Sequence, residues 1–284
     1  MTKPLLAITA LVLTACPRSN TTVEPASDPP PAKIAAKAPQ IDHAGCFLLA
    51  RVDGSEAITV HPDDCAKATV PASTFKVPHA LIALQTGVIA DPTARVKWDG
   101  TKYPDMKAWE ADQDLRSAIR ESVVWYFQRT AEAIGRERMS QWLGELHYGN
   151  ADASGEIRKF WLEAGSLQVT GTQQLDFWQR FAKGELPIDP AHMKTVMNIV
   201  EAPIDFWNGR LPEGESAPPT NAVLHAKTGT AWDDAGTVSW WAGTVDGPRG
   251  KWVFVSRVVT SEPYPGWSAA VREGMKALAQ AQVL

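Results

Sequence analysis

Short apolar runs of strand length stand near both ends of the chain. Residues 46–52 and 57–60 are two such runs, and the turn-forming residues 53–55 separate them. This pattern predicts a β-hairpin, because strand-forming residues flank a short polar turn. Near the C-terminus three more runs follow one another closely, and they predict consecutive strands at residues 223–229, 238–243 and 252–259.

The long segment between these strands has helical periodicity instead. From Ser73 to Thr86 apolar residues recur at helical spacing, and Gly87 ends the run. Pro78, near the start, predicts a kink or a tight first turn. Further helices are expected at residues 111–121, 130–146, 171–183 and 268–281. Strands at both ends with helices between them predict an α/β layer and a helical insertion that share one cleft.

The N-terminal residues have the features of an export signal. Lys3 precedes the apolar run Leu5–Ala15, which is about half as long as a helix that crosses a bilayer. Cys16 follows small residues, and this order resembles a bacterial lipobox, in which the cysteine is acylated after cleavage. An ordinary signal peptide with an incidental cysteine is the alternative. Residues 17–40 contain six prolines and few large apolar side chains, so we expect a solvated tether.

These boundaries divide the chain into three parts. We expect a lipoprotein-type signal peptide at residues 1–15, a tether at 16–40 and a folded domain at 41–284, with a helical part at roughly 93–218. If Cys16 is lipidated, Cys46 and Cys65 are the only free thiols left in the mature chain. In an exported protein they predict one disulfide, although two separate buried thiols are the alternative.

Charge and composition exclude several classes of partner. The net charge is −4, and no run of lysine or arginine suggests a polyanion-binding surface, so we expect no nucleic-acid partner. The six histidines show no metal-binding spacing, so we expect no metal site.

Ser73 and Lys76 form the first candidate catalytic pair. The motif Ser-x-x-Lys at a helix start places a hydroxyl and an amine on one face, within reach of each other. The amine can act as the base that a serine nucleophile needs, and the helix N-terminus favours an anion developing there. Such a motif occurs about once by composition in any chain of this length, so it carries little weight alone.

A second motif, Lys227-Thr228-Gly229, lies within a predicted strand. Lys227 and Gly229 share one face, and the glycine allows a ligand to approach the backbone closely. An edge-strand lysine followed by a bulge is the alternative. The order Ser-x-x-Lys, then Ser122 in the helical part, then Lys-Thr-Gly resembles the active-site serine β-lactamases and penicillin-binding proteins.

The middle motif narrows this resemblance to the class D serine β-lactamases. Ser122 is followed by Val123-Val124, where most relatives carry asparagine in the third position. Further strings similar to class D are Trp125–Gln128, Tyr148–Asn150, Lys97–Gly100, Phe160–Glu163 and Ser239–Gly243. The resemblance covers about residues 45–284 and implies a transpeptidase-like fold, with an antiparallel sheet flanked by helices and a mostly helical subdomain. One departure is the loop after Glu163, which is one residue longer than usual.

The resemblance implies hydrolysis of β-lactam antibiotics, and hence resistance, through an acyl-enzyme on Ser73. Its general base is Lys76 carrying CO₂ as a carbamate (N6-carboxylysine), and no other cofactor is implied. Apolar Val124 and Trp161 suit this chemistry because desolvation lowers the pKa of a lysine, and the indole N–H can donate to the carbamate. Core packing alone is the alternative for Trp161. Glu163 is the rival base, by analogy with class A enzymes.

The other roles also follow from the resemblance. Ser122, assisted by Lys227, relays a proton to the leaving nitrogen, and the backbone N–H groups of Ser73 and Thr230 form the oxyanion hole. In the substrate site, beside Gly229, Thr228 and Arg272 bind the substrate carboxylate. Arg257 is the alternative to Arg272 in this role.

Three other functions compete with hydrolysis. A β-lactam sensor would keep the acyl group, but the chain shows neither further membrane spans nor a zinc motif. Trp161 and Val124 disfavour a D,D-peptidase or transpeptidase acting on cell-wall peptides. The intact motifs disfavour a structural lipoprotein with an inactive site. We therefore expect a periplasmic enzyme acting on small β-lactams, a monomer or homodimer, held to a membrane only through Cys16.

Overall fold

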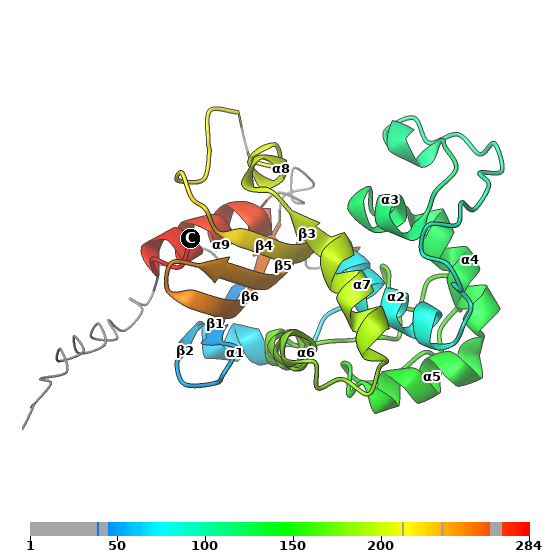
Figure 1. The fold of residues 1–284 in the computed structure, drawn as a ribbon, viewed down its shortest axis with the longest axis horizontal. Coiled ribbons are helices and arrows are strands. Elements are labelled where there is room, and N and C mark those ends of the chain that lie inside the picture. Colours follow the sequence, from blue (N-terminus) through cyan, green and yellow to red (C-terminus); the bar gives the residue numbers. More distant parts are fainter. Residues whose placement is uncertain (1–38, 40–44, 212, 234–235, 262–268) are drawn as a thin grey trace, which may run out of the picture. The chain divides into compact units, whose positions relative to one another are not determined.

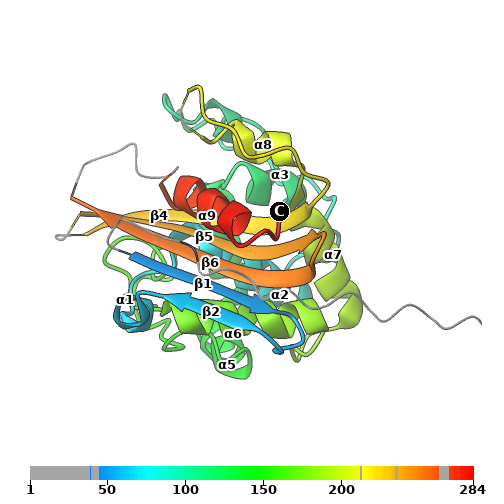
Figure 2. The ribbon, with the colours of Figure 1, turned by 90° about the vertical axis from the view of Figure 1, so that its left-hand side faces the viewer.

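A six-stranded antiparallel sheet is the centre of the folded domain (Figures 1 and 2). The computed structural model describes residues 39, 45–211, 213–233, 236–261 and 269–284. The strand order is β2-β1-β6-β5-β4-β3, and the strands are β1 Gly45–Arg51, β2 Ala57–Val60, β3 Glu201–Ala202, β4 Val223–Asp233, β5 Gly236–Gly247 and β6 Gly250–Thr260. The predicted hairpin and the three predicted C-terminal strands are confirmed. The short strand β3 was not predicted.

Helices cover both faces of the sheet. They are α1 Pro62–Ala66, α2 Lys76–Gln85, α3 Leu115–Arg120, α4 Val124–Ile134, α5 Arg136–Glu145, α6 Gly171–Lys183, α7 Pro190–Val200, α8 Ile204–Asn208 and α9 Ala269–Gln280, with 3₁₀ turns η1 Ala72–Phe75 and η2 Lys107–Trp109. In Figure 2, α9 crosses one face of the sheet, while α2 and α6 lie behind the other.

The alternation of side chains along β5 divides the apolar residues into two cores. Trp240 faces the larger core, which includes α2, α4 and α6, whereas the adjacent Trp241 packs on Phe254 in the core beneath α9. Successive residues of a strand point to opposite faces, so both tryptophans are buried. Helices α2, α4 and α6 therefore pack on one face of the sheet, whereas α9 and Trp207 of α8 pack on the other.

The helix predicted over residues 130–146 is wrong in its extent. The structure has two helices there, α4 and α5, which meet at Gly135. The φ angle of Gly135 is 79°, a conformation that ends a helix and that glycine adopts without strain. Helix α7 was not predicted, although Asp189, whose side chain caps the helix by accepting from the Ala191 N–H, and Pro190 are ordinary helix-start signals.

A disulfide joins Cys46 of β1 to Cys65 of α1. This confirms the first of the two alternatives for these cysteines. Arg257 of β6 reinforces the same corner, since its guanidinium donates to the backbone carbonyls of Asp64 and Lys67.

The predicted signal peptide, Cys16 and nearly all of the tether lie outside the described residues. Within the described part, no helix is both long and apolar enough to cross a membrane.

Candidate active site

Ser73 lies in the 3₁₀ turn η1, and Lys76 begins helix α2. The tight first turn that Pro78 predicts is therefore confirmed. The Lys76 Nζ donates to the Ser73 Oγ at 2.5 Å, so the predicted pair is in hydrogen-bonding contact. Lys76 is completely buried, although lysine is rarely found in that state.

The turn that carries Ser73 is fixed to the sheet and to α6. The indole of Trp240 donates to the Val70 carbonyl at 3.1 Å. Gln174 of α6 donates to the Thr74 hydroxyl at 2.7 Å, and that hydroxyl donates to the Pro71 carbonyl at 2.6 Å. The position of the nucleophile is thus set by buried polar contacts to two different elements.

Gly229 of β4 lies directly against this turn. A Cβ atom at residue 229 would be 2.8 Å from the Pro71 carbonyl oxygen, 2.9 Å from the Thr74 N and 3.0 Å from the Ser73 N. The sequence predicts that Gly229 allows a ligand to approach the backbone closely, and in the structure the backbone of the chain's own nucleophile turn lies against it. Thr230, which is predicted to share the oxyanion hole with Ser73, follows Gly229 on the same strand.

Ser122 lies in the joint between α3 and α4 and links the two lysines. Its Oγ accepts from the Lys76 Nζ at 3.3 Å and from the Lys227 Nζ at 3.1 Å. Its φ angle is 55°, in the left-handed region that non-glycine residues seldom adopt and that is often found at functional sites. The four predicted catalytic residues therefore form one continuous chain of contacts, Ser73–Lys76–Ser122–Lys227.

Burial makes the charged form of both lysines unfavourable. It holds the pKa of Lys76 well below its usual range, and the nearby charge of Lys227 lowers that pKa further, while Glu163 opposes the shift. Burial also lowers the pKa of Lys227 to about 7, with a contribution from the charge of Arg210 that Glu121 opposes. A neutral Lys76 beside a lysine that titrates near neutrality can accept and return protons.

The surroundings of Lys76 are mostly aromatic. Its Nζ lies 5.8 Å from the centroid of the Phe127 ring, and the buried Trp161 packs on Phe75 and His79, which flank Lys76 in sequence. Val124, expected to line this site, is only partly buried. Phe127 was missed, although it follows Val124 by one helical turn.

Two polar atoms in this aromatic cluster have no protein partner. The Trp161 Nε1 and the His79 Nδ1 are both buried and make no hydrogen bond within the described part of the chain. An unsatisfied buried N–H costs stability unless another group accepts it. The His79 ring is neutral near pH 7, because burial lowers its pKa to about 3.

The residues expected to bind the substrate carboxylate contact different partners within the protein. Thr228 accepts weakly from the Lys227 Nζ at 3.4 Å and is only partly buried. Arg272 donates from its Nε to the Glu215 carboxylate at 2.7 Å and also pairs with it through a second nitrogen. Arg257, the rival, is engaged with the backbone of α1 and the residue after it.

The structure also shows the position of Glu163, the alternative base, and the distribution of possible metal ligands. Glu163 is exposed, which places its carboxylate in water rather than in the buried part of the site. No group of His, Cys, Asp and Glu side chains suited to a metal ion occurs among the described residues.

The sheet flanked by helices, with its linked serines and lysines, defines a domain of the penicillin-binding transpeptidase type. The family described as penicillin binding protein transpeptidase domain matches residues 52–276. The Probable beta-lactamase YbxI of Bacillus subtilis (strain 168) is 36% identical over 217 residues, covering 76% of this chain and 75% of the relative. Beta-lactamase OXA-20 of Pseudomonas aeruginosa is 34% identical over 212 residues, covering 74% and 71%.

Solved structures agree with these relatives. A class D β-lactamase from Bacillus subtilis superposes with a TM-score of 0.72 at 33% identity, covering 86% of this chain and 93% of that one. A class D β-lactamase, YbXI from Nostoc, gives a TM-score of 0.74 at 29% identity, covering 84% and 94%. The chain belongs to the class D β-lactamases, and the fold and family expected from the sequence are confirmed.

Proposed function

We propose that the enzyme hydrolyses β-lactam antibiotics through an acyl-enzyme on Ser73 and so confers resistance. The observation that carries this proposal is the chain of contacts Ser73–Lys76–Ser122–Lys227, with both lysines buried, in a class D β-lactamase fold. Each member is within reach of the next, so a proton can pass from the nucleophile to the leaving group.

In the acylation step the side chain of Lys76 takes the Ser73 proton, and the Ser73 Oγ forms a bond to the lactam carbonyl carbon. The backbone N–H groups of Ser73 and Thr230 donate to the oxyanion. When the carbon–nitrogen bond breaks, Ser122 gives its proton to the nitrogen. Lys227, 3.1 Å from the Ser122 Oγ, restores that proton.

We further propose that Lys76 works as a carbamate. Reaction with CO₂ requires a neutral amine, and burial favours that form of Lys76. The buried Trp161 Nε1–H has no hydrogen-bond acceptor among the described residues, and a carbamate oxygen on Lys76 would accept from it. Bound CO₂ supplies an oxygen base for Ser73 and then for the water that hydrolyses the acyl-enzyme. Val124 and Phe127 supply the apolar wall that Lys76 needs.

The carboxylate of the substrate binds beside Lys227. The Thr228 hydroxyl is placed to donate to it, and a guanidinium completes the site. The resemblance assigns Arg272 to this role, but Arg272 is already paired with Glu215. A sensor or a peptidase with the same motifs would acylate in the same way, so turnover is the distinguishing property.

The test is the time course of a chromogenic cephalosporin, with and without added bicarbonate. We expect multiple turnovers by the wild-type enzyme. Trp161→Phe keeps the ring packing and removes the N–H, so we expect its turnover to fall roughly 10-fold at ambient CO₂ and to recover with bicarbonate. Stoichiometric acylation without turnover in the wild type would assign a sensor. Equal bicarbonate dependence of both proteins would leave Trp161 a packing residue.

We propose that the enzyme is exported to the periplasm and anchored through a lipid on Cys16. The lipobox-like order of residues around Cys16 supports this proposal. Intact mass spectrometry of the protein extracted from membranes should find a diacylglyceryl group on an N-terminal Cys16, and Cys16→Ala should release the enzyme into the soluble periplasmic fraction. A soluble wild-type protein with an unmodified Cys16 would contradict the anchor and leave the proposed hydrolysis untouched.

A further inference from the structure

A buried histidine, His79, belongs to the aromatic cluster around Lys76. It lies on α2, three residues after Lys76, and its side chain is completely buried. Its ring packs edge-on against Trp161, with 5.5 Å between ring centroids, and against Phe127, with 5.1 Å. A phenylalanine would pack equally well in this place, so the two ring nitrogens of His79 need an explanation of their own.

The two nitrogens of His79 differ in their contacts. The Nε2 atom lies 3.1 Å from the hydroxyl oxygen of Thr130 on α4. The Nδ1 atom is buried and makes no hydrogen bond within the described part of the chain. A buried polar atom without a partner costs stability. We therefore expect Nδ1 to contact a group that joins the site when the enzyme is active.

Three observations place the His79 ring beside the Lys76 amine. Helical side chains lean toward the N-terminus of the helix, so His79 covers the turn that begins with Lys76. The centroid of the Phe127 ring is 5.8 Å from the Lys76 Nζ, and the same ring packs on His79. Burial and then the charge of Lys76 lower the pKa of His79 to about 3, so the two groups also interact electrostatically.

The unmodified Lys76 amine does not satisfy the two partnerless nitrogens of the cluster. Neither the Trp161 Nε1 nor the His79 Nδ1 is hydrogen-bonded to it, and its Nζ contacts the hydroxyls of Ser73 and Ser122. A carboxyl group added to an amine lengthens the side chain by roughly 2 Å and supplies two acceptor oxygens. Two N–H donors, one from each ring, would match these two oxygens.

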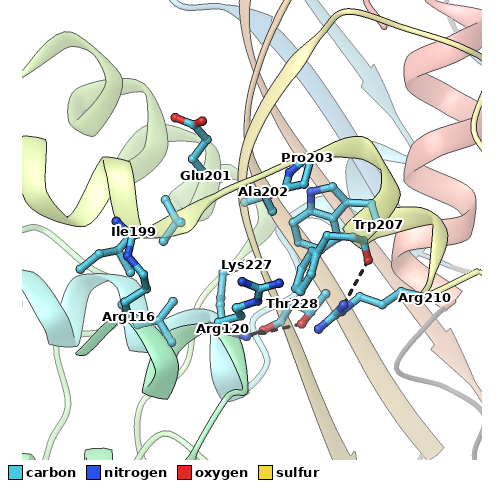
Figure 3. A pocket seen from close by; sticks show the side chains of 14 residues that line it. Arg116, Arg120, Ile199, Glu201, Ala202, Pro203, Trp207, Arg210, Lys227 and Thr228 are labelled. Atoms are coloured by element: carbon cyan, nitrogen blue, oxygen red, sulfur yellow. Dashed lines mark hydrogen bonds between the residues drawn. The ribbon is translucent and has the colours of Figure 1, made fainter. Parts of the chain in front are cut away.

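Arginines near the active site line a cavity beside Lys227 and Thr228, which Figure 3 shows. The basic residues of this lining are Arg116, Arg120, Arg210 and Lys227, and Lys76 is not among the described residues that line it. The charges that act on the pKa of Lys76 are those of Lys227 and Glu163. An anion on Lys76 therefore depends on neutral N–H donors, whose hydrogen bonds to a charged group are strong in a buried site.

Thr130 determines which nitrogen of His79 carries the proton. A neutral imidazole has one N–H, and the Thr130 hydroxyl also has one proton to give. Two acceptors are within reach of that hydroxyl, the Phe127 carbonyl at 3.1 Å and the His79 Nε2 at 3.1 Å. When the hydroxyl donates to Nε2, the ring proton is on Nδ1, and Nδ1 becomes a donor.

We infer that His79 is a positioning residue for the general base: its Nδ1–H donates to one oxygen of the Lys76 carbamate, and Thr130 holds the required tautomer. Trp161 donates to the other oxygen. This inference rests on the proposed function, because the carbamate is the group that His79 holds. The affinity of the enzyme for CO₂ then depends on the Nδ1 of His79.

The test measures the affinity for CO₂ without any substrate. Carbon-13-labelled bicarbonate is titrated into the enzyme at fixed pH, and the carbamate is followed by its carbon-13 NMR signal. His79→Asn keeps an N–H donor near the position of Nδ1, whereas His79→Gln places its amide near that of Nε2. We expect half-saturation within about 3-fold of the wild type for His79→Asn and at a roughly 10-fold higher bicarbonate concentration for His79→Gln, as for loss of a hydrogen bond to a charged group.

His192→Asn and His192→Gln are the matched controls, because His192 of α7 also contacts α2, with its Nδ1 3.1 Å from the Gln85 side chain. They should leave half-saturation unchanged. Nitrogen-15 NMR of the wild type in saturating bicarbonate needs no variant and should find the His79 proton on Nδ1. A proton on Nε2, or a His79→Gln variant that binds CO₂ as tightly as His79→Asn, would overturn the inference. A wild-type enzyme without a carbamate signal would instead contradict the proposed carbamate.

Discussion

Lys76→Met should lower kcat/KM for a penicillin roughly 10³- to 10⁴-fold, the range expected for loss of a general base. Methionine is an unbranched apolar side chain that ends where the lysine amine begins, so most of the space in the aromatic surroundings stays filled while the amine disappears. The Ser73 hydroxyl then has no partner at 2.5 Å to take its proton. The measurement is the steady-state rate in saturating bicarbonate, which keeps CO₂ supply from limiting the wild type.

The same substitution should make the protein more stable at neutral pH. Burial lowers the pKa of Lys76 in the folded state, so between that value and the ordinary lysine pKa the unfolded chain binds more protons, and the wild type loses stability. This loss is complete below the folded pKa and disappears as pH rises toward the ordinary value. The Tm advantage of Lys76→Met should therefore shrink as pH approaches about 10.

Lys183→Met is the matched control for both measurements, because Lys183 is exposed at the end of α6. We expect it to leave turnover and Tm nearly unchanged. Substantial turnover by Lys76→Met would remove Lys76 as the base and turn attention to Glu163.

Gly229→Ala should lower kcat/KM roughly 100-fold, the effect expected when a reacting group is misplaced by about 1 Å. The new methyl group would stand within 3.0 Å of three backbone atoms of the nucleophile turn. Backbone cannot rotate away as a side chain can, so either β4 or the turn must move. We expect acylation by a fluorescent penicillin, followed on denaturing gels, to slow in proportion to kcat/KM.

Gly144→Ala provides the control, because a Cβ atom there meets no other atom within 4 Å. It lies inside α5, where alanine favours the helix, so Tm should stay the same or rise. If Gly229→Ala is acylated at the wild-type rate, then a glycine at this position is not needed to keep the nucleophile turn in its active geometry.

The sequence motifs, together with the family resemblance, were sufficient to predict the four residues that the structure brings into contact, Ser73, Lys76, Ser122 and Lys227. Strand alternation and the Ser-x-x-Lys and Lys-Thr-Gly motifs are patterns within short stretches of the chain, so they can be recognised without knowing which distant residues lie nearby. The break at Gly135 was missed because the apolar period continues across it, and only a φ angle of 79° separates α4 from α5. Helix extent was thus less predictable than helix position.

The roles of the arginines depend on contacts between distant segments. Arg272 and Glu215 are 57 positions apart, and no pattern along the chain announces their pairing. Arg257 was the rival because it was expected in the strand next to that of Lys227. In the structure β5 separates these two strands, and Arg257 binds the backbone carbonyls of Asp64 and Lys67.

The nucleophile turn and the α8–β4 segment are supported differently. Buried bonds from Trp240 and Gln174 hold the turn, whereas a partly exposed ion pair between Arg272 and Glu215 holds the segment. Mutations that break the exposed ion pair cost little stability. Mutations that remove one partner of the buried hydrogen bonds cost more, because they leave a buried polar group unsatisfied. Substitutions at Arg272 or Glu215 should therefore accumulate more readily than substitutions at Trp240 or Gln174 as sequences of this family diverge.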